Sequence, residues 1–223
     1  MKSQVTIIYY TSNQEGKRFE KKIQERLLEA VKGVSPPIPI VSVSQKPISL
    51  GKNICVGEKY PCDINIWRQK LIACKEAKTP FVICAEADCL YPPEYFNYVP
   101  SDVNHHYRYL NVWIMEKGKD FFYRKESSEG AEMVGREHYI KQIEKALIGK
   151  PEWATETDAL AMGRIIVLWK RGWVPWHGKN PVISIKTGDG IRAHARLMDD
   201  QPIAEKLPYW GSIEKVKKEM FNG

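Results

Sequence analysis

The sequence predicts an α/β fold: a mostly parallel central sheet flanked by helices, arranged as a three-layer sandwich. Residues 5–90 alternate between strand and helix patterns, as in a parallel sheet whose strands are joined by helices. The third strand, Phe81 to Cys84, is an uninterrupted apolar run, which is typical of a strand buried on both faces. Two acids, Glu86 and Asp88, follow it directly. Ligands of open α/β sheets bind at the carboxyl ends of strands, so the pattern also indicates a site.

The first strand and helix have the most regular pattern. Val5 to Tyr10 is a β-branched and aromatic run that ends in a polar loop, so we expect a strand there. Apolar residues then recur every four positions across residues 16–31, and Gly33 follows as a stop signal. This periodicity predicts an amphipathic helix that packs on the sheet through Phe19, Ile23, Leu27 and Val31.

A second strand and helix lead to the acid pair. Prolines interrupt the chain before the sequence IVSVS, residues 40–44, which predicts a strand. Asp63 has the side chain of an N-cap, and the apolar stripe of the residues after it predicts a helix. Thr79 and Pro80 end that helix just before the acid-tipped strand.

The second half of the chain predicts a mixture of strands and helices. LNVWIM and DFFYRK flank a Lys-Gly-Lys turn and indicate a pair of strands in a hairpin. Apolar spacing predicts helices at about 136–147 and 157–170. A strand over 182–185 leads to a glycine-rich loop, and residues 212–221 predict a short charged helix.

The composition favours a soluble protein with anionic partners. The net charge of +7 and a pI near 9.0 favour nucleotide phosphates, nucleic acid or an acidic membrane surface. No apolar run is long enough to cross a bilayer, and the first residues are too quickly polar for a secretory signal, so we expect a cytoplasmic protein. The five cysteines match no zinc spacing, which favours reduced core residues.

A second acid cluster, Glu156-Thr157-Asp158, opens the helix expected near residue 157. Thr155 and Asp158 fit a capping box, and acids in a first turn are favoured by the helix dipole. A carboxylate held at a helix start also suits a general base that acts on an acceptor hydroxyl. Both interpretations stay open at this point.

Together, these features resemble the nucleotide-sugar glycosyltransferases of the GT-A fold, particularly the family 2 type. The matching features are the acid-tipped strand, Trp67 and Arg68 on the helix before it, and an acid cluster opening a helix that closes with Gly172-Trp173. The stretch EGAEMVGREHYIKQI is similar to the acceptor-side segment, in which a glycine-rich strand precedes a helix. The resemblance covers roughly residues 5–175. Glu86 replaces the first acid of the usual D-x-D, and Thr157 splits the usual Glu-Asp pair.

The resemblance implies a GT-A, Rossmann-like domain with two functional halves. Residues 1–115 are expected to bind the nucleotide sugar and a metal, and residues 116–223 the acceptor. The implied activity is a metal-dependent transfer, with inversion, of a sugar from a nucleoside-diphosphate sugar to an acceptor hydroxyl. Asp158, or Glu156 as the alternative, is the implied base.

The resemblance also implies the donor-site residues. Asp88 is expected to bind Mn or Mg directly, with Glu86 facing the ribose or a metal-bound water, and the metal offsets charge on the departing diphosphate. His194 is the implied late metal ligand. The residues implied to touch the nucleotide or its diphosphate are Thr11, Ser12, Asn13 and Arg68.

Other functions remain as alternatives because the basic charge suits nucleic acid. The chain is then a glycosyltransferase that acts on nucleic-acid bases, or a non-catalytic basic nucleic-acid-binding protein. A nucleotidyltransferase is disfavoured because YYTSNQEGKRFE lacks the glycine-rich, arginine-containing loop that such enzymes carry after the first strand.

Overall fold

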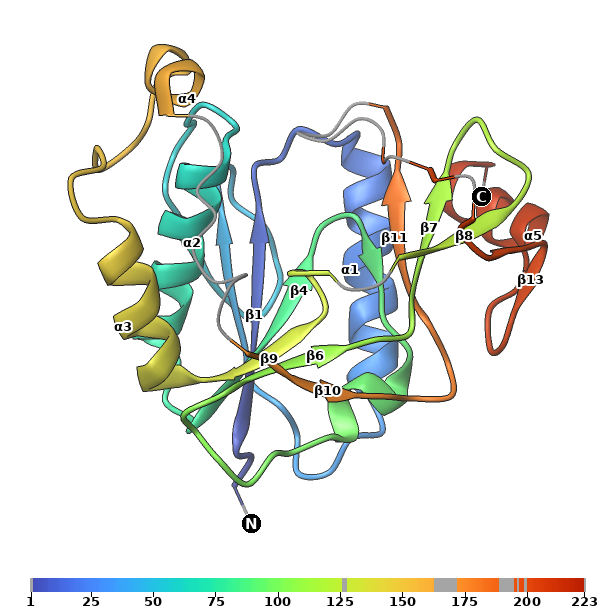
Figure 1. Cartoon of the computed structure of the whole chain (residues 1–223), viewed down its shortest axis with the longest axis horizontal. Helices are drawn as coiled ribbons and strands as arrows, with labels where there is room; N and C mark the ends of the chain where they lie inside the picture. The colour runs from blue at the N-terminus through green and yellow to red at the C-terminus, as the bar shows by residue number, and fades with distance from the viewer. Residues whose placement is uncertain are drawn as a thin grey trace.

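The computed structural model describes residues 2–125, 128–162, 172–188, 195, 197–198 and 200–222. Within these residues the main sheet has seven strands (Figure 1). Their spatial order is β10 (Val174–Trp176), β6 (His106–Tyr109), β9 (Glu132–Gly135), β4 (Phe81–Glu86), β1 (Val5–Thr11), β2 (Ile40–Ser44) and β3 (Lys52–Cys55).

The main sheet is mostly parallel. Strand β1 lies inside the sheet, between β2 and β4, and both pairings are parallel. Strand β9 pairs antiparallel with β4 and with β6, whereas β2–β3 and β6–β10 are parallel. The strands expected at 5–10, 40–44 and 81–84 are therefore present, and each pairs in parallel with a neighbouring strand.

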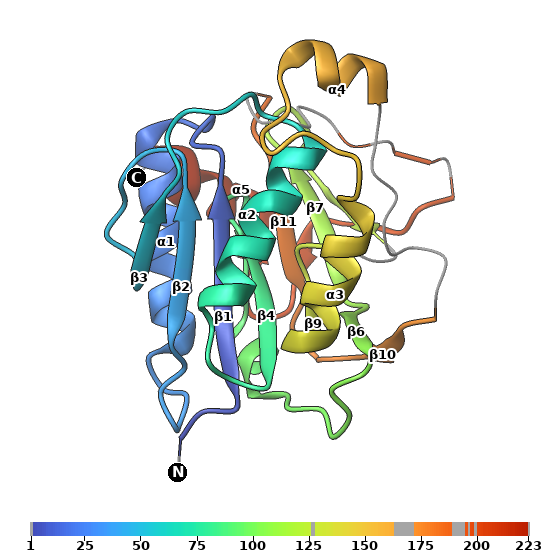
Figure 2. The same ribbon diagram turned by 90° about the vertical axis from the view of Figure 1, so that its left-hand side faces the viewer.

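Helices cover both faces of this sheet (Figure 2). On one face, α1 (Lys17–Val31) packs its buried side chains against Ile7 and Tyr9 of β1. On the other face, α2 (Asp63–Glu76) and α3 (Arg136–Ala146) pack against Ile8 and Tyr10. Successive side chains of a strand point to opposite faces, so β1 contributes to both cores. The three-layer α/β fold class predicted from the sequence is confirmed.

A second sheet lies beside α1 and continues the acid-tipped strand. Its order within the described residues is β12 (Ile203–Ala204), β8 (Phe122–Lys125), β7 (Val112–Glu116), β11 (Val182–Lys186) and β5 (Cys89–Leu90). Strands β7 and β8 form the expected antiparallel hairpin. Because β5 follows β4 after two residues, the Glu86-Asp88 segment joins the two sheets.

Shorter elements complete the described chain. A 3-10 helix spans Pro93–Asn97, α4 spans Glu156–Met162, and α5 (Ile213–Lys217) continues into a π-helical turn, Lys218–Asn222. Strands β13 (Lys206–Leu207) and β14 (Gly211–Ser212) form a small ribbon.

Several details differ from the sequence expectations. Cys62 is the N-cap of α2, and Asp63 lies in its first turn, so the predicted cap is wrong by one position. The helix expected at 157–170 begins at Glu156 and is described to Met162, because the rest lies outside the described residues. The proposed boundary at 115/116 falls within β7, and the functional division remains a prediction.

The remaining chain-level expectations concern thiols and membranes. The five cysteines are free thiols, and four of them are buried, as expected for core residues, but Cys55 is exposed. Among the described helices, none combines the length and apolar character that a membrane span requires.

Candidate functional site

The acid-tipped strand ends in a compact cluster of ligand-type side chains. Glu86, Asp88 and Cys89 each place one ligand atom within 4.8 Å of the others, the only such group of three among the described residues. Glu86 is the last residue of β4 and Cys89 the first of β5. The sequence prediction that both acids stand together at the carboxyl end of a buried strand is therefore met.

Asp88 forms an ion pair with Lys186, the last residue of β11. The distance between Lys186 Nζ and Asp88 Oδ2 is 2.7 Å, and the two side chains are 11% and 22% exposed. The backbone fixes this contact, because Ile185 N donates to Asp88 O and β11 pairs antiparallel with β5. Burial alone raises the pKa of Asp88, but the Lys186 ammonium outweighs burial and holds that pKa below its usual value. The same pair raises the pKa of Lys186 against the effect of its own burial.

Glu86 is held by three surrounding groups. Tyr10 of β1 donates its hydroxyl to Glu86 Oε1 at 2.9 Å. The backbone N–H of Glu86 donates to the hydroxyl of Tyr91, which donates to Gly130 O. Gly130 is needed at this point because a Cβ there overlaps the carboxylate of Glu86. Glu86 therefore has one defined position at the edge of the sheet.

Two further groups surround the acids. Cys89 Sγ donates to Asp88 Oδ1 at 3.4 Å and to Glu86 Oε2 at 3.8 Å. Burial and the neighbouring carboxylates raise the thiol pKa of Cys89 well above its usual value, so the thiol stays protonated. Lys125 Nζ donates to Ser128 Oγ, which also accepts from the backbone N–H of Gly130 beside Glu86. Burial lowers the pKa of Lys125, and the Glu86 carboxylate opposes that shift.

Mn and Mg take oxygen ligands, which the carboxylates of Glu86 and Asp88 supply at this site. Tyr10 donates to Glu86 Oε1 and Lys186 to Asp88 Oδ2, while the other two carboxylate oxygens share the single thiol hydrogen of Cys89. The ammonium of Lys186 supplies the positive charge that a metal brings. These residues do not fit a divalent ion as they stand, because the ion and the Lys186 ammonium repel each other on the same carboxylate. His194, the other predicted ligand, lies outside the described residues.

The polar loop after β1 lies at the same edge. Thr11 and Asn13 use their side chains within the protein: both donate to Glu20, and Asn13 Oδ1 accepts the backbone N–H groups of residues 45 and 46. Asn13 has φ 52°, a conformation that asparagine adopts more readily than most residues. Ser12, between them, is partly exposed. The loop is therefore a rigid support that presents Ser12 at the edge.

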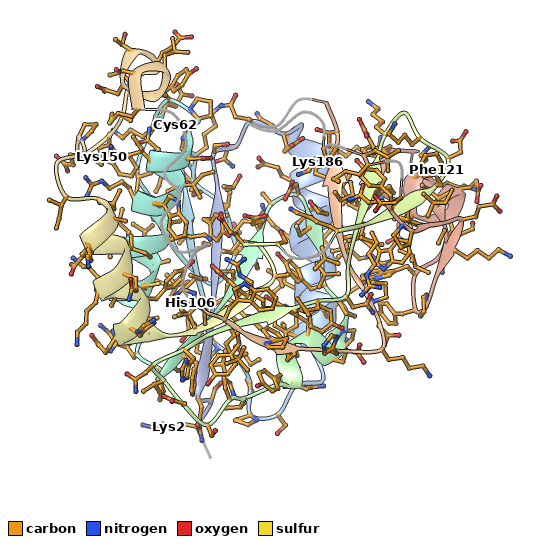
Figure 3. The ribbon with its side chains drawn as sticks, viewed as in Figure 1. Lys2, Cys62, His106, Phe121, Lys150 and Lys186 are labelled. Carbon is orange, nitrogen blue, oxygen red and sulfur yellow. The ribbon has the colours of Figure 1, made fainter. Side chains whose placement is uncertain are left out.

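The tip of β11 is tied to the segment that follows this loop. Thr187 Oγ1 donates to Glu15 Oε2 at 2.6 Å. Strands β1 and β11 end at the same end of the molecule (Figure 1), and Lys186 is labelled near it in Figure 3. The loop of residues 11–13, the acid pair and Lys186 thus share one edge.

Arg68 occupies a different environment from the one that the resemblance implies. Its guanidinium donates to Lys150 O at 3.1 Å and to Pro151 O at 2.7 Å. Asn65, one turn earlier on α2, exchanges hydrogen bonds with the backbone of Ala154. These contacts anchor the connection before α4. Within the described residues, no contact joins Arg68 to Glu86 or Asp88.

The second acid cluster forms the capping box. Asp158 Oδ2 accepts from the backbone N–H and the hydroxyl of Thr155, both at 2.8 Å, and Thr155 Oγ1 accepts from Asp158 N. The hydrogen bond from the backbone of Thr155 lowers the pKa of Asp158. Glu156 is exposed. Figure 1 shows α4 over the upper end of α2, at the end of the molecule where β1 finishes.

A buried ionic network stands behind the edge. Lys70 of α2 and Glu132 of β9 lie 3.5 Å apart, and both side chains are 1% exposed. Tyr139 donates its hydroxyl to Glu132, while His106 and Arg108 of β6 face the same carboxylate. The Lys70 ammonium also lies over the ring of Tyr10, which holds Glu86. The network therefore supports the acid pair from the core.

Sequence reasoning missed Lys186, Lys125 and the Lys70–Glu132 pair. For Lys186 a signal was present: it follows the apolar run VISI directly, as Glu86 follows its own apolar strand. A charge immediately after a buried strand is placed at the sheet edge, whatever its sign. The buried pair has no such signal, because charged residues inside elements usually face solvent.

Comparisons with known proteins give distant likenesses only. No protein-family model and no curated protein sequence matches the chain. S. aureus TarS 1-349 is 10% identical with a TM-score of 0.48, covering 84% of this chain and 62% of that one. A glycosyltransferase involved in the glycosylation of the major capsid of PBCV-1 is 10% identical with a TM-score of 0.45, covering 80% and 84%. The catalytic domain of Drosophila beta1,4galactosyltransferase 7 is 12% identical with a TM-score of 0.42, covering 87% and 76%. Likenesses this distant assign no ligand and no reaction to this protein.

Proposed function

We propose that the protein is a glycosyltransferase that takes its sugar from a nucleoside-diphosphate sugar. The observation that carries this proposal is the cluster at the carboxyl edge of β4, where Glu86 and Asp88 meet Lys186. Carboxylates accept hydrogen bonds from ribose or sugar hydroxyls, and a lysine offers charge to phosphate. A nucleotide sugar contains both kinds of group side by side.

The reaction that suits this site is a displacement at the anomeric carbon of the sugar. The acceptor oxygen forms the new bond to that carbon, and the bond to the diphosphate oxygen breaks. Its electron pair leaves with the nucleoside diphosphate, while the acceptor proton passes to a carboxylate base. Attack from the face opposite to the leaving group gives inversion, which remains a prediction.

The base belongs to the start of α4 in this proposal. Asp158 is the first candidate, because three hydrogen bonds with Thr155 fix its position and catalysis rewards rigid placement. Its lowered pKa makes it a weaker base, which keeps Glu156 as the alternative. Among the described residues, no hydrogen bond or ion pair engages the side chain of Glu156.

The metal cofactor, the acceptor and the location are separate predictions. The metal dependence implied by the resemblance stays a prediction, because Lys186 already forms an ion pair with Asp88. The acceptor is unassigned, and the +7 charge keeps an anionic polymer such as nucleic acid as a candidate. A cytoplasmic location likewise remains a prediction.

The direct test is release of nucleoside diphosphate from a panel of nucleotide sugars, with and without Mn. Wild-type protein should hydrolyse at least one donor slowly, and Asp88→Asn should lose that activity. Asp120→Asn is the matched control, because Asp120 is 93% exposed and pairs with Lys217 rather than with a residue of the site. If Asp88→Asn turns over as fast as wild type, the assignment is wrong.

A further inference from the structure

We propose that Lys186, assisted by Lys125, is the site that binds the diphosphate of the donor, so that nucleotide binding needs no divalent ion. This inference rests on the proposed function and assigns a specific role within it. It starts from the position of the Lys186 ammonium, 2.7 Å from the carboxylate that the resemblance gives to a metal.

A metal ion at such a site has a defined role toward the substrate phosphates. A hard divalent cation links protein carboxylates to substrate phosphates and neutralises both. An ammonium group carries three N–H donors, and Lys186 uses one of them on Asp88. The others remain to donate to phosphate oxygens, since Asp88 is its one hydrogen-bond acceptor within the described residues. Lys186 can therefore make the same link from carboxylate to phosphate.

The side chain of Lys186 is preorganised for binding. Surface lysines are flexible and lose side-chain entropy when they bind a ligand. Lys186 is 11% exposed, and the backbone contact between Ile185 and Asp88 fixes the strand that carries it. Asp88 in this account is a positioning residue for Lys186, which explains why the acid remains at the site without holding a metal.

Lys125 supplies a second amine. Lys125 is the last residue of β8, is partly buried, and donates to Ser128 Oγ at 3.5 Å. Ser128 Oγ also accepts from the backbone N–H of Gly130, the residue that lies directly against the Glu86 carboxylate. The two lysines balance the two carboxylates, so an incoming diphosphate does not meet an uncompensated acid pair. A diphosphate has two phosphate groups, and two amines can donate hydrogen bonds to both of them.

The experiment is calorimetric titration of UDP, GDP, ADP, CDP and the corresponding monophosphates, in EDTA and then in MnCl2. We expect wild-type protein to bind one diphosphate in EDTA with an affinity close to that in Mn, and its monophosphate more weakly. Loss of one charged hydrogen bond in Lys186→Met should weaken that binding about tenfold or more. Lys125→Met should weaken it less.

Three further variants separate binding from folding. Lys186→Arg keeps the charge and should retain most of the binding. Asp88→Asn combined with Lys186→Met removes both charges, so a loss of binding in this folded variant does not come from an unpaired buried acid. Lys217→Met is the control, since Lys217 pairs with the exposed Asp120 and should bind as wild type does.

The outcomes also separate this inference from the function on which it rests. Binding that appears only with Mn, or that is unchanged in Lys186→Met, overturns the role of the lysine and leaves the glycosyltransferase proposal standing. Absence of binding by any nucleotide in either buffer overturns both. Binding in EDTA that is lost in Lys186→Met and kept in Lys217→Met supports the inference.

Discussion

The ammonium of Lys186 lies 2.7 Å from the carboxylate of Asp88, although 98 positions separate the two residues in the sequence. The contact exists because β5, two residues after the end of β4, pairs with β11 and brings the ends of two strands together. It places a cation where the resemblance to GT-A enzymes implies a metal. The proposed donor end of the site is therefore built from acids and amines of the chain itself.

Gly130→Ala should damage the site although it replaces no ionisable residue. A Cβ at this position overlaps the carboxylate of Glu86, which is held by Tyr10 and cannot move freely. We expect a loss of about 1–3 kcal/mol in the free energy of unfolding, as for other overpacked positions, together with weaker nucleotide binding. Urea unfolding and calorimetry measure the two effects.

Gly118→Ala is the control for this substitution, because a Cβ at Gly118 meets nothing within 4 Å. It should leave stability within about 0.5 kcal/mol of wild type. If Gly130→Ala behaves like Gly118→Ala, the close approach between Gly130 and Glu86 does not matter.

Much of the fold follows from sequence periodicity. Strands β1, β2, β4, β7, β8 and β11 and helices α1, α2 and α3 were predicted, because each has one regular apolar pattern. Strand β6 was not, since its four buried residues include His106 and Arg108, whose polar side chains imitate an exposed segment. Polar residues that are buried against partners from other elements cannot be recognised from a local pattern.

The site was predicted in part for the same reason. Glu86 and Asp88 are visible because they stand at the end of an apolar strand. Their partners come from elsewhere: Tyr10 from the neighbouring strand β1, and Lys186 from a strand of the other sheet. Pairings of this kind depend on sheet topology, which strand patterns do not determine. Arg68 was assigned from its position before the acid-tipped strand, whereas its contacts are with the backbone before α4.

Glu132→Gln should be strongly destabilising. It leaves the ammonium of Lys70, with 1% of its side chain exposed, without the carboxylate that compensates it. Breaking a buried ion pair on one side costs about 3–5 kcal/mol. Glu144→Gln is the control, because its pair with Lys75 is about half exposed and should contribute less than about 1 kcal/mol. Chemical unfolding at neutral pH compares the two, and similar losses would contradict the importance of the buried pair.

The same residue predicts how stability depends on pH. Burial raises the pKa of Glu132, but Lys70, His106 and Arg108 outweigh it and lower that pKa from 4.5 to about 2. A lowered folded pKa means that the unfolded chain binds the proton more tightly. The contribution of Glu132 is therefore complete above the unfolded value and is lost as pH falls toward 2. The difference in unfolding free energy between wild type and Glu132→Gln should be constant from pH 7 to 5 and shrink by pH 3. A constant difference over the whole range would count against this assignment.

Asp158→Asn tests the identity of the base. Asparagine can keep an oxygen acceptor for Thr155, so the cap of α4 should survive while the ability to take a proton is lost. Loss of a general base lowers kcat by about 10²–10⁴, with little change in KM. Glu156→Gln should remain active, and the reverse pattern transfers the role to Glu156. The helical signal in circular dichroism checks that α4 is intact in both variants.

The most direct measurement is a crystal structure of the protein with the nucleoside-diphosphate sugar that binds best, grown in EDTA. The account predicts that the diphosphate lies within hydrogen-bonding distance of Lys186 Nζ, with the nucleoside next to the loop of residues 11–13. A nucleotide bound at another edge of the sheet, or held at Asp88 only through an added metal with Lys186 displaced, would contradict it.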